Sequence, residues 1–154
     1  MLARRRGEPA NMRRIPRYHG FIAAVVLTLV SASAGMAQGT TMAAQLTGGE
    51  WVVESVGGVS VSGDRRARIA FAADGRVTGS GGCNRLMGRA DINGEAITFG
   101  TLATTRLACV PKVMEQERKL LDAMAATRSY RIADAMLTLH DASGAELVRL
   151  MRRA

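Results

Sequence analysis

The chain has 154 residues, a formal net charge of +8 and 47% hydrophobic residues, which fits a single globular domain with a modest core. Six of its 21 basic residues and one of its 13 acidic residues precede residue 38. The rest of the chain holds 15 basic and 12 acidic residues, a net charge of +3, and its aromatic side chains do not alternate with basic clusters. This composition argues against a nucleic-acid-binding surface.

Residues 1–37 have the composition of a secretory signal peptide. A basic head precedes the apolar run 21–30, and small residues follow that run. Cleavage is expected after Ala34 or Ala37, and Met12 is an alternative start with its own basic head. A membrane anchor is the competing interpretation, but spanning a bilayer takes about 20 apolar residues. We therefore expect a periplasmic or secreted protein with no stable membrane anchor after cleavage.

Residues 38–49 are small and polar and predict a flexible leader, and residues 152–154 predict a basic tail. Between them, short apolar runs separated by turn dipeptides such as Asp74-Gly75 and Asn93-Gly94 predict an antiparallel meander. The expected strands are 50–56, 68–72, 76–80, 88–92, 96–99, 129–133, 136–140 and 146–151. We predict a mostly β (α+β) fold, a small antiparallel barrel-like meander of about eight short strands with one packed helix.

One helix is expected to begin near Pro111 and to extend to residue 127, because proline is tolerated in a first turn. Its apolar stripe is formed by Val113, Met114, Leu120, Leu121, Met124 and Ala125. Glu117 falls inside this stripe. It is either turned to solvent at the stripe edge, or buried and paired with Arg85, Arg106 or threonine hydroxyls, because an unpaired buried carboxylate is costly.

The two cysteines, Cys83 and Cys109, are 26 positions apart. The first lies in the glycine-rich segment 79–88 and the second ends the threonine-rich segment 100–109. An even cysteine pair in a small exported domain indicates a disulfide, which would bring these segments together. Free thiols, either inert or redox-active, are the alternative.

No catalytic constellation is evident in the sequence. His140 is the one histidine after residue 37, and a strand-end histidine without a matched nucleophile is a poor candidate for a base. The cysteines lack the close ligand spacing of zinc sites, and the glycine run lacks the Gly-Lys-Ser/Thr ending of a phosphate loop. We expect no enzyme activity, no metal and no cofactor.

Three segments carry a resemblance to a known family. They are the Gly-Gly-Cys-Asn-Arg run from residue 81 with Gly88, the run 99–109 that ends at Cys109, and Glu117 followed by two leucines. Together they resemble the META domain of the heat-shock protein HslJ family, from Trp51 to about Leu150. Leu107 replaces a methionine common in the family, and the lipid-attachment cysteine of many members is missing.

The resemblance implies a small antiparallel barrel-like fold with a packed helix. It also implies a periplasmic or envelope role, linked in some members to heat shock and antibiotic tolerance. It does not imply an enzyme. The candidate interaction or structural motif consists of Gly82, Asn84, Arg85, Gly88, Thr104, Thr105 and Glu117.

Two hypotheses about function follow from these residues. The first is a monomeric, non-catalytic binding module for an envelope protein, and its contact surface would be the loop Cys83-Asn84-Arg85 together with Thr104-Thr105-Arg106. The alternative is a small-ligand-binding or enzymatic site at the barrel mouth around Arg85, Thr105 and Glu117. A purely structural role for these side chains, satisfying loop backbone groups, is a further interpretation.

Overall fold

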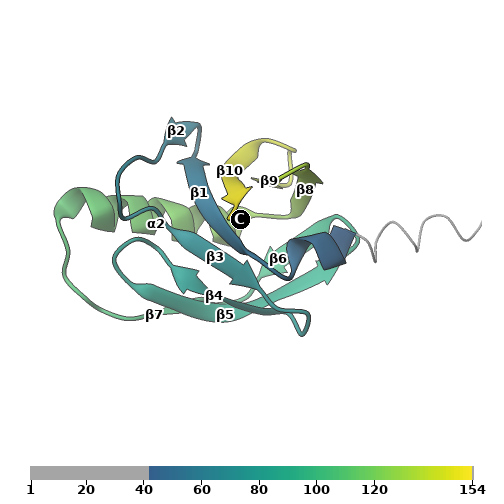
Figure 1. Cartoon of the computed structure of the whole chain (residues 1–154), viewed down its shortest axis with the longest axis horizontal. Helices are drawn as coiled ribbons and strands as arrows, with labels where there is room; N and C mark the ends of the chain where they lie inside the picture. Colours follow the sequence, from purple (N-terminus) through teal and green to yellow (C-terminus); the bar gives the residue numbers. More distant parts are fainter. Residues whose placement is uncertain (1–41, 154) are drawn as a thin grey trace, which may run out of the picture. The chain divides into compact units, whose positions relative to one another are not determined.

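The structure is a computed structural model that describes residues 42–153 (Figure 1). The predicted signal peptide, both cleavage sites and the alternative start at Met12 lie outside the described residues. The strands are β1 (Glu50–Val56), β2 (Val59–Ser60), β3 (Arg68–Phe71), β4 (Arg76–Ser80), β5 (Arg85–Asn93), β6 (Ala96–Phe99), β7 (Ala103–Thr104), β8 (Ser129–Ala133), β9 (Met136–His140) and β10 (Glu146–Arg152). Helix α2 (Pro111–Ala126) connects β7 to β8.

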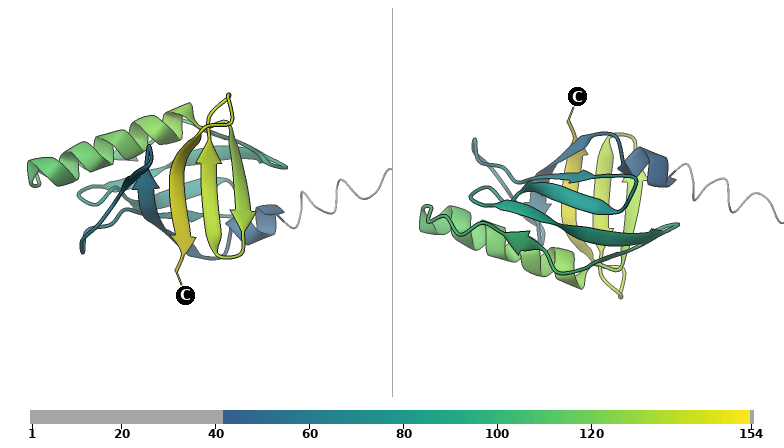
Figure 2. Two further views of the ribbon diagram at one scale, coloured as in Figure 1. Left: turned by 90° about the horizontal axis from the view of Figure 1, so that it is seen from above. Right: turned by 90° about the horizontal axis from the view of Figure 1, so that it is seen from below.

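Eight of these strands form a closed antiparallel barrel. The order β10-β9-β8-β6-β5-β4-β3-β1 is closed by pairing between β1 and β10. Figure 2 shows β8, β9 and β10 side by side, as their pairing requires. Strands β2 and β7 are two-residue additions, paired to β1 and β5 respectively. The predicted fold class is therefore confirmed.

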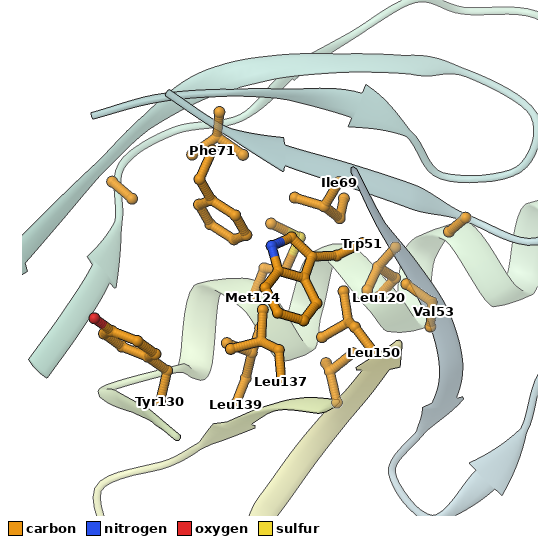
Figure 3. Packing of buried hydrophobic residues seen from close by; sticks show 14 of the residues in the cluster. Trp51, Val53, Ile69, Phe71, Leu120, Met124, Tyr130, Leu137, Leu139 and Leu150 are labelled. Atoms are coloured by element: carbon orange, nitrogen blue, oxygen red, sulfur yellow. The ribbon is translucent and has the colours of Figure 1, made fainter. Parts of the chain in front are cut away.

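Inward-facing side chains fill the barrel, because alternate residues of each strand point to the same face. Trp51 is fully buried among Leu137, Leu139 and Leu150, with Leu120 and Met124 of α2 nearby (Figure 3). A β-bulge between Val53 and Ser55 shifts the register of β1, so Val53 and Val56 are both buried. Strand β1 thus supplies the centre of the core.

Helix α2 packs on the barrel through one stripe of side chains. Glu117, Leu120 and Met124 are its buried residues, and they are spaced as one helical face requires. Met114, which the sequence pattern placed in the same stripe, is instead 44% exposed. It lies in the first turn of α2, and this part of the helix runs beside Gly82 of the glycine-rich segment rather than over the core.

Three expectations about local structure are corrected. The predicted flexible leader 38–49 contains a short helix over residues 42–46, whose Leu46 is fully buried. Its carbonyl oxygen accepts a 2.9 Å hydrogen bond from Trp51 Nε1. Strand β5 begins at Arg85 rather than Gly88, because Arg85 already pairs with Ser80 of β4. The glycine-rich turn is therefore limited to residues 81–84. The basic tail begins one residue later than expected, since Arg152 ends β10.

Candidate functional site

The two cysteine segments meet beside the first turn of α2. Cys83 and Cys109 form a disulfide with their Cα atoms 6.0 Å apart, which confirms the predicted bond. We call the surface made by residues 81–85 and 104–110, together with Met114, the cysteine platform. It joins the end of β4, the start of β5 and the segment that enters α2.

Asn84 is a buried member of the platform, and its side chain is the centre of the hydrogen bonds that join the platform to α2. It is 5% exposed. Its Oδ1 accepts from the Thr105 hydroxyl at 2.9 Å and from the Leu107 backbone N–H at 2.7 Å. Its Nδ2 donates to Glu117 Oε1 at 2.7 Å. One side chain therefore connects the glycine loop, the threonine-rich segment and α2.

Glu117 is buried, at 7% exposure. Its Oε2 accepts from the backbone N–H groups of Asn84 at 2.7 Å and of Cys83 at 3.3 Å. The interpretation of a solvent-turned glutamate is therefore wrong. The buried alternative is correct, but the expected partners are not, because a side-chain amide and two backbone N–H groups take the place of an arginine or a threonine hydroxyl.

The glycines of this loop are required by close approach. A Cβ at Gly81 would lie 2.4 Å from Glu117 Cγ, and one at Gly82 would lie 2.7 Å from the Arg65 carbonyl oxygen. Gly82 also has a φ of +108°, which other residues rarely adopt. Any side chain at these positions would push α2 or the Arg65 segment away from the loop.

Gly88 lies outside this contact, in the middle of β5. A Cβ there would be 2.6 Å from Leu102 Cδ2 and 2.9 Å from the Thr101 carbonyl oxygen. Because Gly88 has no side chain, Thr101 and Leu102, which precede β7, can cross closely over β5.

The remaining predicted site residues lie on the outer face of the platform. The side chains of Arg85, Thr104, Thr105 and Arg106 are exposed. The Arg85 backbone N–H donates to Thr105 Oγ1 at 3.2 Å, and the Thr105 N–H returns a 3.1 Å bond to the Arg85 carbonyl. The side-chain oxygens of Glu117 and Thr105 are thus committed to the loop, which does not favour a ligand or reaction at these atoms.

The sequence did not point to the apolar part of this surface. Leu107, Val110 and Met114 are 61%, 62% and 44% exposed. They are large side chains close together along the chain, and the Met114 backbone N–H donates to the Val110 carbonyl oxygen at 3.3 Å. Exposed apolar patches mark interaction sites. In the sequence, Leu107 is visible only as a departure from the related family, and the helical pattern places Met114 in the core stripe.

Two carboxylates with perturbed pKa values lie in turns. Bonds from the Ser143 hydroxyl and from the backbone N–H groups of Ala145 and Ser143 hold the pKa of Asp141 below its usual value. The backbone N–H of Arg76, and then its guanidinium, lower the pKa of Asp74. Both shifts follow from hydrogen bonds made within the turns themselves.

His140 lies at the end of β9, away from the cysteines. Its Nδ1 lies 3.2 Å from the Gly144 carbonyl oxygen, and its Nε2 lies 2.9 Å from Thr138 Oγ1. Within residues 42–153, no three His, Cys, Asp or Glu side chains are grouped as metal ligands. None of the helices in that range has the length and hydrophobicity to cross a membrane.

The sequence of this chain matches the META domain family over residues 44–154. Among curated proteins, no sequence matches. One solved structure, described as an NMR structure of the protein, is 26% identical with a TM-score of 0.59, over 71% of this chain and 92% of that one. An NMR structure of a protein from Burkholderia xenovorans is 20% identical with a TM-score of 0.58, over 91% and 99% of the two chains, and shares the fold.

The family match spans every barrel strand, α2 and both cysteines. The fold, the disulfide and the sequence match therefore agree, and the chain belongs to the META domain family.

Proposed function

We propose that this chain is an exported, non-catalytic binding module of the bacterial cell envelope, and that the cysteine platform is its contact surface. The observation that carries the proposal is the group of exposed apolar side chains Leu107, Val110 and Met114, at 61%, 62% and 44% exposure. Arg85 and Arg106 of the same platform are also exposed, and Arg106 directly precedes Leu107 in the chain. Methionine, arginine and large apolar side chains are enriched where proteins bind one another.

The inner side of the platform supports the same proposal. A binding surface gains affinity when it is rigid before the partner arrives, because less conformational entropy is lost on binding. Here the disulfide and the Asn84–Glu117 hydrogen bonds fix the loop from below. Thr105 belongs to this network through its hydroxyl. Within residues 42–153 the side chains of Arg85 and Leu107 form none of these hydrogen bonds, so they are available to a partner.

Export is supported by the basic, apolar and small-residue order of residues 1–37. A disulfide is compatible with an oxidising compartment. The mature protein begins at residue 35 or 38 and is a monomer without a membrane anchor. The META domain is not a known enzyme family. The resemblance of this chain to HslJ proteins motivates a role in heat-shock or antibiotic tolerance.

The contact surface is tested by crosslinking the exported protein to its neighbours in intact cells. A Leu107→Ser/Val110→Ser variant and an Arg85→Ala variant remove apolar and charged parts of the platform. Met151→Ser is the control, since Met151 is 37% exposed and lies on β10, outside the platform. We expect the platform variants to lose a crosslinked partner that the wild type and the control both retain. Identical crosslinked sets from all four proteins would contradict the proposal.

The stress role has a separate test. A strain that lacks the gene should grow less well than its parent at raised temperature or with an antibiotic present. Wild-type protein should restore growth, and the Leu107→Ser/Val110→Ser variant should not. Restoration by that variant would separate the physiological role from the platform.

A further inference from the structure

A half-open pocket of about 170 Å³ lies between the β1–β2 hairpin and the first half of α2. Val56, Val59 and Val61 form its sheet side. Lys112 and Gln116 are on its helix side. None of its lining residues belongs to the cysteine platform, so the proposed function leaves this pocket unexplained.

The sheet side offers an apolar wall to a ligand. Val59 is 67% exposed, the largest exposure among the large apolar side chains in the described residues, while Val56 at its base is 8% exposed. A cavity of about 150 Å³ is enough to hold benzene. The pocket therefore has room for an apolar group about the size of one aromatic ring.

The helix side carries an unusual concentration of lysine. The chain contains two lysines among its 21 basic residues, Lys112 and Lys119, and both line this pocket. Lys119 Nζ is 2.8 Å from Glu115 Oε1, one helical turn away. Lys112 forms no ion pair within residues 42–153. The pocket thus has one uncompensated positive charge beside its apolar wall.

Gln116 lines the pocket as well. Its Nε2 is buried beside the glycine loop, 3.6 Å from the point that a Cβ on Gly82 would occupy, and it has no hydrogen-bond acceptor within residues 42–153. Buried polar groups without partners are uncommon and call for an explanation. Rotation of this side chain into the pocket would give the amide an acceptor if an anion were bound beside Lys112.

We propose that this pocket binds a small monoanionic carboxylate with a ring-sized apolar body. The carboxylate oxygens accept from Lys112 Nζ and Gln116 Nε2, and the apolar body packs on the three valines. The charges fit a monoanion, because Lys112 and Lys119 are opposed by the single carboxylate of Glu115. A divalent cation would find one carboxylate, which is already paired with Lys119.

The two lysines permit a direct test on the intact protein. Reductive methylation with ¹³C-formaldehyde labels both lysine amines as well as the N-terminal amine and retains their charge, so the two lysine NMR signals report on this pocket. The probes are benzoate and benzyl alcohol, which share a ring but differ in charge. We expect benzoate to shift the Lys112 signal saturably, with a dissociation constant of about 1 mM, and benzyl alcohol to bind at least about tenfold more weakly. No saturable shift with benzoate, or equal binding of the two probes, would overturn the proposal.

Variants assign the binding to these residues. Lys112→Met removes the charge, and Arg118→Met is its control on the exposed side of α2. Binding is then followed through the Lys119 signal and the Val59 methyl groups. We expect Lys112→Met to weaken benzoate binding at least about tenfold, as loss of a charge-assisted hydrogen bond implies, and Arg118→Met to leave it unchanged. Equal loss of binding in both variants would show a general charge effect and refute the site. No loss in Lys112→Met would show that Lys112 does not bind benzoate, which would refute the site as well.

Val59→Asp is a second variant on an exposed position, where folding is not at risk. It places a negative charge on the apolar wall and should abolish benzoate binding. Retained binding would also refute the proposed site. Neither result depends on the cysteine platform, so this proposal and the proposed function can fail separately.

Discussion

The side chains of Asn84 and Glu117 bind each other at 2.7 Å beneath the disulfide-closed loop. The same carboxylate also accepts from the Asn84 backbone N–H at 2.7 Å. Residues 33 positions apart therefore connect α2 to the glycine loop through two hydrogen bonds to one charged group. Removing that group would leave buried donors without partners, which costs more than the net value of the bonds.

We expect Glu117→Leu to lower the free energy of unfolding by about 2–3 kcal/mol, since a buried donor left unpaired costs about 1–3 kcal/mol. Glu115→Leu is the matched control two residues away, where the carboxylate is exposed and its partner is Lys119. That control should leave the urea midpoint nearly unchanged, because exposed ion pairs contribute little. Equal midpoints for the two variants would show that the Asn84–Glu117 contact does not hold the loop.

Gly81→Ala tests the closeness of α2 to the loop. Its new Cβ would lie 2.4 Å from Glu117 Cγ, so the helix or the loop must move, at a cost of about 1–3 kcal/mol. Gly100→Ala is the control, because the nearest atom to its Cβ would be the Arg89 carbonyl oxygen at 3.6 Å. Thermal or urea unfolding should show a lower midpoint for Gly81→Ala only. If both variants unfold like the wild type, the loop is not packed on Glu117.

The disulfide should stabilise the domain through the length of chain that it closes. For a separation of 26 residues, the chain-entropy estimate is about 3.5 kcal/mol. We expect Cys83→Ser, Cys109→Ser and chemical reduction of the wild type to lower the urea midpoint by similar amounts. A midpoint that does not change on reduction would show that the bond adds no stability.

Tyr130 gives the domain a predicted pH dependence. Its ring is fully buried and its hydroxyl has no hydrogen-bond partner among residues 42–153, and burial raises the pKa of Tyr130 above its usual value of 10.0. The unfolded chain therefore loses this proton at lower pH than the folded protein does. Between the two pKa values the folded state binds more protons, so the free energy of unfolding falls as the pH rises above about 10.

Tyr130→Phe should remove this part of the alkaline dependence while other groups titrate as before. At pH 8 the variant should be at least as stable as the wild type, because it lacks a buried unpaired hydroxyl. Urea midpoints of both proteins at pH 8 and above pH 10 make the comparison. A variant that is clearly less stable at pH 8 would show that the hydroxyl has a partner.

Much of the barrel could be predicted because its turns are local. Asp74-Gly75 and Asn93-Gly94 determine hairpins from two residues each, and the strands on either side follow from alternation. The closure of β1 onto β10 could not be predicted in this way. That pairing joins the two ends of the domain, and no local pattern reports it.

The site was predicted in part for the same reason. The burial of Glu117 was one of two interpretations because the helical stripe passes through it. Its partner Asn84 lies 33 positions away, and helical periodicity cannot say which loop residue lies below a given turn. The exposure of Met114 also depends on tertiary structure. The apolar stripe of α2 extends to Met114, but the buried residues of the helix begin only at Glu117.

The central claim is that this chain is exported and that a disulfide between Cys83 and Cys109 closes its cysteine platform. The intact mass of the exported protein tests this claim most directly. The protein is alkylated once without reduction and once after it. We predict a mass that begins at residue 35 or 38, with alkyl groups added only after reduction. A mass that retains residues 1–37, or cysteines that react before reduction, would contradict the account.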